Sequence, residues 1–213
     1  MKNIINHIKQ EAEDRFAASR GSHDLDHSLR VRNVCLHIGQ KENADLEVLE
    51  IAALLHDIAR HMQDESHGKI CHAEKGAEIA KEILLNYDIP ETKVNAILHC
   101  IATHRSRGTK TPISLEAKIL YDADKIDCIG ATGVGRTFLF AGEIGSKFHD
   151  KNIDLDTTQS YTKEDTAYRE YMLKLRFIKD NMYTNEGKRI AEERHNFMVE
   201  FFDRLNNEVD GVW

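Results

Sequence analysis

The adjacent residues His56 and Asp57 are the strongest chemical signal in the sequence, because they directly follow an apolar run at residues 51–55. Neighbouring residues of a helix point about 100° apart, so an ordinary helix would bury one of these side chains and expose the other. An ion beside the end of the helix could be reached by both side chains, and it would neutralise a carboxylate that the apolar run desolvates. Because a His-Asp pair also occurs by chance, other residues must show whether this pair binds an ion.

Two more residues give the pair its meaning through their order along the chain. His27 lies near the start of one predicted helix, His56 and Asp57 end the next, and Asp122 follows much later in the segment 122–127, Asp-Ala-Asp-Lys-Ile-Asp. In this order the sequence resembles the HD superfamily of metal-dependent phosphohydrolases, whose pattern is a histidine, a His-Asp pair and a distant aspartate. The resemblance implies that His27, His56, Asp57 and Asp122 are metal ligands.

The resemblance covers most of the chain and points to the small stand-alone bacterial and archaeal HD-domain hydrolases. Ala59 stands where relatives usually have glycine, and Lys125 stands where arginine is common. Neither departure removes a ligand or a positive charge. The segments that carry the resemblance are residues 23–27, 53–60, 72–77, 115–118, 122–127, 130–136 and 174–184.

Two imidazoles and two carboxylates form a donor set of mixed hardness. Such a set suits a divalent manganese, iron, cobalt, nickel or magnesium ion better than a closed structural zinc site. With four protein ligands, an ion that prefers octahedral coordination would have open coordination positions for water and a phosphate oxygen. A bound ion lowers the pKa of its water and polarises the phosphoryl group, so the expected chemistry is hydrolysis. Whether one or two ions bind is left open.

Phosphate hydrolysis also needs a proton donor for the leaving group, and we expect Asp57, His104 and His72 to be the catalytic residues. His104 lies at a predicted helix end beside a polar loop. His99 lies five positions earlier, about 140° round the helix, so both cannot face the site equally, and we favour His104. The resemblance implies a further role for His72, because this position supplies a ligand to a second ion in related binuclear enzymes.

Hydrolysis further needs positive charge at the non-bridging phosphate oxygens. Three cations lie near the ligand-bearing segments, and their clustering predicts a phosphate pocket. The resemblance alone adds two more. The candidate substrate-binding residues are therefore Lys75, Arg105, Lys125, Arg136 and Lys174.

The apolar residues recur at helical spacing throughout, and no strand-like alternation is sustained, so the sequence predicts an all-α fold. We expect residues 1–213 to form a single HD domain, a helical bundle with the metal site in its core. The metal-binding core should cover about residues 20–130, with C-terminal helices at 160–209 packed on it. Two long helices, at 163–182 and 185–208, should end the chain. Five glycines between residues 129 and 145 indicate close helix packing and turns rather than a phosphate loop.

Composition excludes several classes of protein. Of the 213 residues, 41% are apolar, and no apolar run is long enough to span a bilayer, so a cytoplasmic protein is expected. The four cysteines form no Cys-x-x-Cys pair, which argues against a disulfide framework. A net charge of −7 disfavours non-specific nucleic-acid binding. Apolar faces on the final helices could support a homodimer.

The leading interpretation is a phosphohydrolase acting on a small phosphorylated metabolite, above all a nucleotide, with release of phosphate or pyrophosphate by a metal-activated water. The motifs leave open a cyclic-nucleotide or other phosphodiesterase. A second hypothesis is a di-iron HD-fold oxygenase, which needs extra ligands from His72, His99 or His104. A third is a nucleotide-sensing module that binds without turnover.

Overall fold

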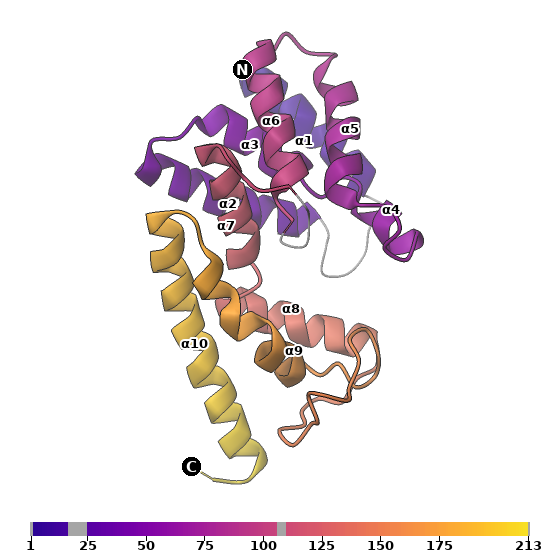
Figure 1. Ribbon diagram of the computed structural model, residues 1–213, viewed down its shortest axis with the longest axis vertical. Coiled ribbons are helices and arrows are strands. Elements are labelled where there is room, and N and C mark those ends of the chain that lie inside the picture. The colour runs from indigo at the N-terminus through magenta and orange to yellow at the C-terminus, as the bar shows by residue number, and fades with distance from the viewer. Residues whose placement is uncertain (1, 17–24, 106–109, 213) are drawn as a thin grey trace. The chain divides into compact units, whose positions relative to one another are not determined.

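The computed structural model describes residues 2–16, 25–105 and 110–212, and within these ranges every regular element is helical, as predicted (Figure 1). The chain divides into two compact units, Met1–Asp124 and Lys125–Trp213, each with its own packing. No helix in the described ranges combines the length and apolar character needed to cross a membrane. The packing of residues 160–209 on the metal-binding core stays a prediction.

The centre of the first unit is α3 (Leu46–Leu55), a helix with apolar side chains on all its faces. Seven of its ten residues are buried, from Val48 to Leu55 with a gap only at Glu50. Asp45 caps the helix start, since its carboxylate accepts hydrogen bonds from the backbone N–H groups of residues 47 and 48. A helix that is apolar all round must be enclosed by other helices, and it therefore forms the core of this unit.

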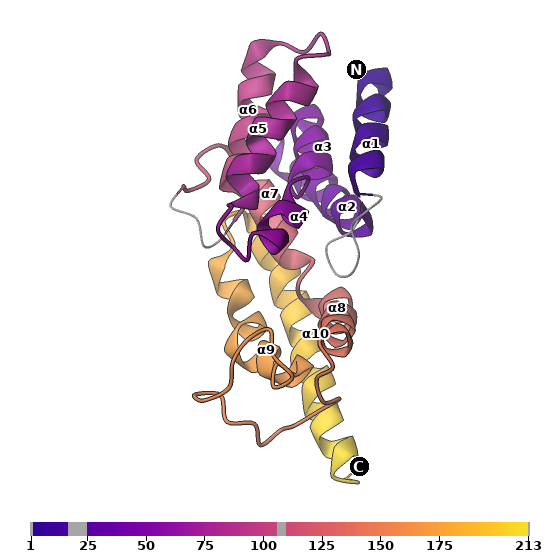
Figure 2. The same cartoon turned by 90° about the vertical axis from the view of Figure 1, so that its right-hand side faces the viewer.

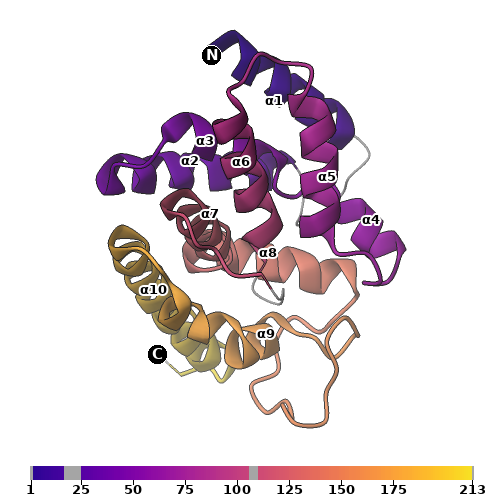
Figure 3. The ribbon, with the colours of Figure 1, turned by 45° about the horizontal axis from the view of Figure 1, so that its top comes forward.

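Three helices pack directly on this core, and further helices extend it. The helices α2 (Leu25–Glu42), α1 (Lys2–Phe16) and α6 (Glu91–Thr103) pack directly on α3. Figure 2 shows α3 between α1 on one side and α6 on the other. α5 (His72–Leu84) packs along α6, and the short α4 (Arg60–Glu65) packs against α5 (Figure 3). Most of α7 (Leu115–Ile126) also belongs to this unit, which ends at Asp124.

In the first unit, most helix positions follow the predictions from the sequence, with two differences. The sequence predicts that the second helix stops near Gly39, whereas α2 runs to Glu42. The helix α4 was not predicted, because six residues show no helical repeat of apolar positions. The sequence also predicts a helix end at Gly21 and Ser22 and a loop at 105–112; Gly21, Ser22 and residues 106–109 lie outside the described residues.

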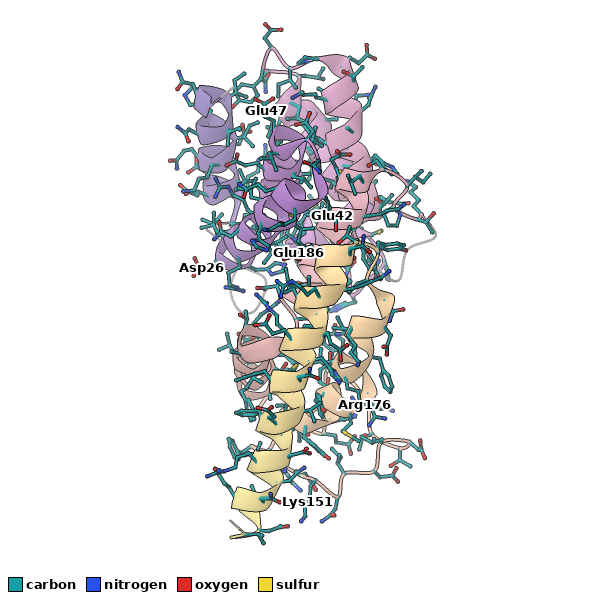
Figure 4. The ribbon with its side chains drawn as sticks, turned by 90° about the vertical axis from the view of Figure 1, so that its left-hand side faces the viewer. Asp26, Glu42, Glu47, Lys151, Arg176 and Glu186 are labelled. Atoms are coloured by element: carbon teal, nitrogen blue, oxygen red, sulfur yellow. The ribbon has the colours of Figure 1, made fainter. Side chains whose placement is uncertain are left out.

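The second unit contains α8 (Gly130–Glu143), α9 (Ala167–Leu173), the 3₁₀ helix η1 (Leu175–Asn181) and α10 (Asn185–Val209). α10 packs on α8 and η1. The core is aromatic: the rings of Tyr171 and Phe202 stack with their centroids 4.4 Å apart, and Phe138 and Tyr168 adjoin Phe202. Figure 4 shows Lys151 beside the C-terminal end of α10, where it forms an ion pair with Asp210.

The prediction of one long helix at 163–182 is wrong, because the segment forms α9 and η1 with a break at Lys174 (φ −137°, ψ −55°). The residues before α9 are held in a loop by Arg169, which is 4% exposed. Its guanidinium donates to Asp165 Oδ1 at 2.8 Å and to the Thr158 carbonyl at 2.7 Å. After the break, the 3₁₀ winding places Leu175 and Ile178 on one face, where both are buried.

Two glycines of α8 are required by close packing, in agreement with the prediction from the sequence. Gly130 has φ +75°, and a Cβ atom there would lie 2.8 Å from the Arg194 side chain. A Cβ atom at Gly133 would lie 2.2 Å from the Cys128 carbonyl oxygen, which is backbone and cannot rotate away. Gly142, in the same helix, has open space at this position.

Gly133→Ala should therefore lower the thermal unfolding temperature, while Gly142→Ala should leave it unchanged or raise it. The first change forces the backbone at Cys128 to move; the second removes the helix penalty of glycine, about 1 kcal/mol. In a chain of this size, 1 kcal/mol corresponds to about 2–4 °C. Differential scanning calorimetry of both variants checks the difference, and equal shifts would contradict it.

Candidate metal centre

Six buried histidine and aspartate side chains converge within the first unit, and each comes from a different position in the helical framework. His27 lies on α2, His56 caps the C-terminus of α3, and Asp57 follows it. His72 is the first residue of α5, His104 caps the C-terminus of α6, and Asp124 lies on α7. None of the six is more than 9% exposed.

Three of the side chains form one group of donor atoms around His27. Its Nε2 atom lies 3.3 Å from His56 Nε2 and 3.3 Å from Asp124 Oδ1. These donor atoms are close enough to one another to share a single ion.

Asp57 joins this group to a second pair of histidines. Its Oδ2 atom faces His27 and His56, with the Nε2 atoms 3.7 Å and 3.9 Å away. Its Oδ1 atom faces His72 and His104, at 3.2 Å and 3.5 Å. The Nε2 atoms of His72 and His104 are 3.0 Å apart. Each oxygen of one carboxylate thus faces its own pair of imidazoles.

The Nδ1 atoms fix which nitrogen of each ring carries the hydrogen. His56 Nδ1 lies 2.8 Å from the Ala53 carbonyl oxygen, and His104 Nδ1 lies 2.7 Å from that of Ile101. His72 Nδ1 lies 2.8 Å from Gln63 Oε1. Because all three partners are acceptors, the Nδ1 atoms donate, and in the neutral rings the Nε2 atoms carry lone pairs.

This arrangement fits a divalent metal ion. Lone pairs on facing Nε2 atoms repel one another, and they meet beside two buried carboxylates, so a positive charge is needed at their centre. Nitrogen and oxygen donors in this mixture suit the manganese, iron, cobalt, nickel and magnesium ions that the sequence predicts. An outer acceptor on the second imidazole nitrogen is also the usual environment of a histidine that binds a metal.

Burial keeps two of these imidazoles neutral at physiological pH. It lowers the pKa of His56 to about 4, although the Asp57 carboxylate opposes the shift. Burial likewise lowers the pKa of His72 to about 3, against the same carboxylate, with the positive charge of Arg60 among the further causes. Neutral imidazole is the form that binds a metal, so neither ring must lose a proton first.

The aspartate near His27 differs from the one assigned from the sequence. Within the described residues, the donor groups that could share an ion include Asp124 and do not include Asp122. Asp122 is fully buried two residues earlier on α7, about 200° round the helix, so both cannot point to the same side. Asp124 was overlooked because the segment 122–127 contains three aspartates, and their order alone does not show which one faces α2.

The predicted substrate-binding cations are distributed over both units. In the first unit, Lys75 is exposed and pairs with Glu78, and Arg105 contacts the Cys71 sulfur at 3.5 Å. In the second unit, Lys125 is half-buried on α7, while Arg136 pairs with Asp127 and Lys174 with Glu170. The roles of all five stay predictions.

The preference for His104 over His99 agrees with the geometry. His104 belongs to the cluster, whereas His99 Nε2 accepts a hydrogen bond from the backbone N–H of Ile113 at 3.2 Å. Two residues on α4, Arg60 and Gln63, were not predicted as site residues. Arg60 lies in the segment 53–60 that carries the resemblance, whereas the signal for Gln63 was only its position shortly after the His-Asp pair.

An all-helical fold with clustered buried histidines and aspartates defines a candidate metal-binding protein, and comparisons with known proteins identify its family. Residues 24–129 match the model of the HD domain. YpgQ of Bacillus subtilis is 33% identical over 194 residues, which cover 89% of this chain and 86% of YpgQ. The chain belongs to the HD family.

Solved structures agree with this assignment. The crystal structure of Bacillus subtilis YpgQ in complex with ADP matches with a TM-score of 0.75 and 28% identity, over 99% of this chain and 97% of that one. An HD-superfamily hydrolase from Bacillus thuringiensis matches with a TM-score of 0.77 and 26% identity, over 98% of both chains. Ribonuclease Y of Chloroflexus aurantiacus is 32% identical over 119 residues, but these are only 21% of its length.

Asp124→Asn should weaken metal binding more than Asp122→Asn, because only Asp124 lies among the donor atoms. Loss of an outer partner of a metal ligand already costs about 10–100-fold in affinity, so loss of a ligand should cost at least about 100-fold. Titration with Mn²⁺ against a fluorescent chelator measures both variants. The reverse order would restore Asp122 as the ligand.

Proposed function

We propose that the protein is a metal-dependent phosphohydrolase that acts on a small phosphorylated metabolite, above all a nucleotide, with water as the attacking group. The position of Asp57 between two pairs of imidazoles carries this proposal. Its two carboxylate oxygens face different pairs of imidazoles, so one carboxylate joins two groups of donor atoms. Two donor groups joined by a carboxylate suit a centre that holds both an attacking water and a phosphoryl oxygen.

The chain's own residues would contribute as follows. A bound divalent ion would supply a water of lowered pKa and an electrophile for the phosphoryl oxygen. His27, His56, Asp57 and Asp124 would hold that ion, with Asp124 in place of the aspartate assigned from the sequence. His72, with its pKa near 3, is neutral at physiological pH, so it suits the role of a ligand better than that of a proton donor.

Arg60 supports binding of an anionic group beside this centre. It lies three residues after Asp57, and its backbone N–H donates to the Asp57 carbonyl oxygen at 2.8 Å. The side chain is only 17% exposed, and its Nε atom donates to Asp64 at 3.3 Å. Neither Nη group donates to any described residue, so both could donate to phosphate oxygens. Arg105 follows His104 in the chain, and its guanidinium contacts the sulfur of Cys71, the residue before His72.

The nucleotide part of the proposal draws on the complex of YpgQ with ADP, since YpgQ aligns with nearly the whole of this chain. Which bond is cleaved, a phosphoanhydride or a phosphate ester, depends on the substrate, and a cyclic-nucleotide phosphodiesterase remains within the same chemistry.

A screen of nucleoside mono-, di- and triphosphates, cyclic nucleotides and sugar phosphates with Mn²⁺, Co²⁺, Ni²⁺ and Mg²⁺ tests the proposal. Release of phosphate or pyrophosphate is expected with at least one combination of substrate and metal ion. Asp57→Ala should abolish this release, because the change removes the carboxylate shared by both pairs of imidazoles. Asp88→Ala, at an exposed aspartate, is the control and should retain full turnover. Binding of nucleotides without turnover under all conditions would favour a sensing module instead.

Arg60→Gln should raise the KM and the ADP dissociation constant about tenfold or more, because a hydrogen bond to a charged group contributes about 1.5–3 kcal/mol. Asp64→Asn removes the same ion pair but keeps the cation, so it should leave both values nearly unchanged. Isothermal titration calorimetry with ADP and steady-state kinetics measure the effect. Equal losses in the two variants would mean that the ion pair, and not the cation, matters.

A di-iron oxygenase is the second candidate, and the pairing of His72 and His104 beside Asp57 favours it. This pair supplies the donors that a second iron would need beyond the first group. Iron content and oxygen consumption by protein purified with iron test this function. Full hydrolytic activity with redox-inert Mg²⁺ and no oxygen uptake with iron would exclude it.

A further inference from the structure

Among the described residues, only Gln63, on α4, forms a hydrogen bond with His72 Nδ1. The distance from His72 Nδ1 to Gln63 Oε1 is 2.8 Å. The same oxygen lies 3.4 Å from the backbone nitrogen of His72, the first residue of α5. Cys71, at the N-cap position of α5, makes no capping hydrogen bond with its side chain. One amide oxygen thus lies within hydrogen-bonding distance of both the first backbone N–H of α5 and the imidazole of His72.

The orientation of the Gln63 amide follows from its neighbours. The backbone N–H of His72 can only donate, so the amide atom facing it must be the oxygen and not the NH₂ group. Because that oxygen cannot donate, the hydrogen of the shared bond belongs to His72 Nδ1. The Nε2 atom of the neutral ring is then left with a lone pair.

The lone pair on His72 Nε2 faces a second lone pair, on His104 Nε2. His104 Nδ1 donates to the Ile101 carbonyl oxygen at 2.7 Å, so His104 Nε2 is also unprotonated in the neutral ring. The two Nε2 atoms are 3.0 Å apart, and two acceptors at this distance repel unless a positive charge lies at them. With the opposite tautomer of His72, Nε2–H would donate to His104 Nε2, and the pair would be satisfied without any ion.

We propose that Gln63 is a positioning residue that selects the Nδ1–H tautomer of His72 and thereby makes the His72–His104 pair a cation site instead of a hydrogen-bonded pair. Its place is set by the chain around Asp57, because the Arg60 N–H at the start of α4 donates to the Asp57 carbonyl oxygen at 2.8 Å. The residue that faces both imidazoles and the residue that orients one of them therefore belong to one short segment.

The part of this inference that concerns metal affinity rests on the proposed metal centre, whereas the tautomer can be measured without metal. Long-range ¹H–¹⁵N spectra of the metal-free protein, with His72 assigned by mutation, report which nitrogen is protonated. Nδ1–H is expected in the wild type. Gln63→Leu, which removes the acceptor at similar size, should shift His72 to the Nε2–H tautomer. An Nε2–H ring in the wild type, or an unchanged Nδ1–H ring in Gln63→Leu, would overturn the inference.

Metal titration provides the second readout. Gln63→Leu should weaken Co²⁺ binding by about 10–100-fold, as expected for the loss of an acceptor behind a metal-binding histidine. Gln63→Glu keeps an acceptor of the same length and should retain the affinity of the wild type. Gln40→Leu, at an exposed glutamine of α2, is the matched control and should have no effect. A loss in Gln63→Glu equal to that in Gln63→Leu would contradict a role as acceptor.

A double-mutant cycle separates positioning from general destabilisation. If Gln63 acts through His72, adding Gln63→Leu to His72→Ala should cause no further loss of Co²⁺ affinity. Additive losses would overturn the inference, because they would show an effect of Gln63 that does not pass through His72. If instead the wild-type protein binds no divalent ion, the proposed function fails, while the tautomer measurement still decides the role of Gln63.

Discussion

The buried carboxylate of Asp57 is the constraint on which the first unit depends. An ionised carboxylate in an apolar interior is strongly destabilising unless charges and hydrogen-bond donors compensate it. Asp57 is 4% exposed, and burial lowers the pKa of His56 on one side of it to about 4 and that of His72 on the other side to about 3, so these two imidazoles offer it little positive charge. Asp57 directly follows the apolar α3 and lies as deep as its last residues, since Leu54, Leu55 and His56 are all buried. The stability of the core and the demand for a cation thus have one origin.

The sequence predicted the parts of this arrangement that follow from local patterns. The apolar spacing predicted α1, α2, α3, α5 and α10. The His-Asp pair and His27 predicted three residues of the cluster. The resemblance led to Asp122 and not to Asp124, although both lie on α7 and are separated by about half a turn. That choice depends on the rotation of α7 about its axis, which packing sets and which a run of closely spaced aspartates does not reveal.

The elements that could not be predicted are short and are held by side-chain contacts. α4 has six residues, too few for a repeat of apolar positions, and Gln63 became recognisable only through its contact with His72. The break at Lys174 was hidden for a different reason. Tyr171, Leu175 and Ile178 are spaced as in an α-helix, and the change to 3₁₀ winding leaves that spacing intact. The buried Arg169 that holds the loop before α9 resembled any other surface cation in the sequence.

His56 and His104 share a feature with a consequence for the order of events at the centre. Both are C-terminal caps, of α3 and α6, so two helices end at the cluster, and each helix C-terminus carries about half a unit of negative charge. Together with the carboxylates of Asp57 and Asp124, these helix ends add negative charge around the cluster, and the N-terminus of α5 at His72 offsets only part of it. Such a charge distribution favours a divalent cation over a free phosphate. Under the proposed function, a bound ion would therefore reverse the local potential before a phosphorylated substrate binds.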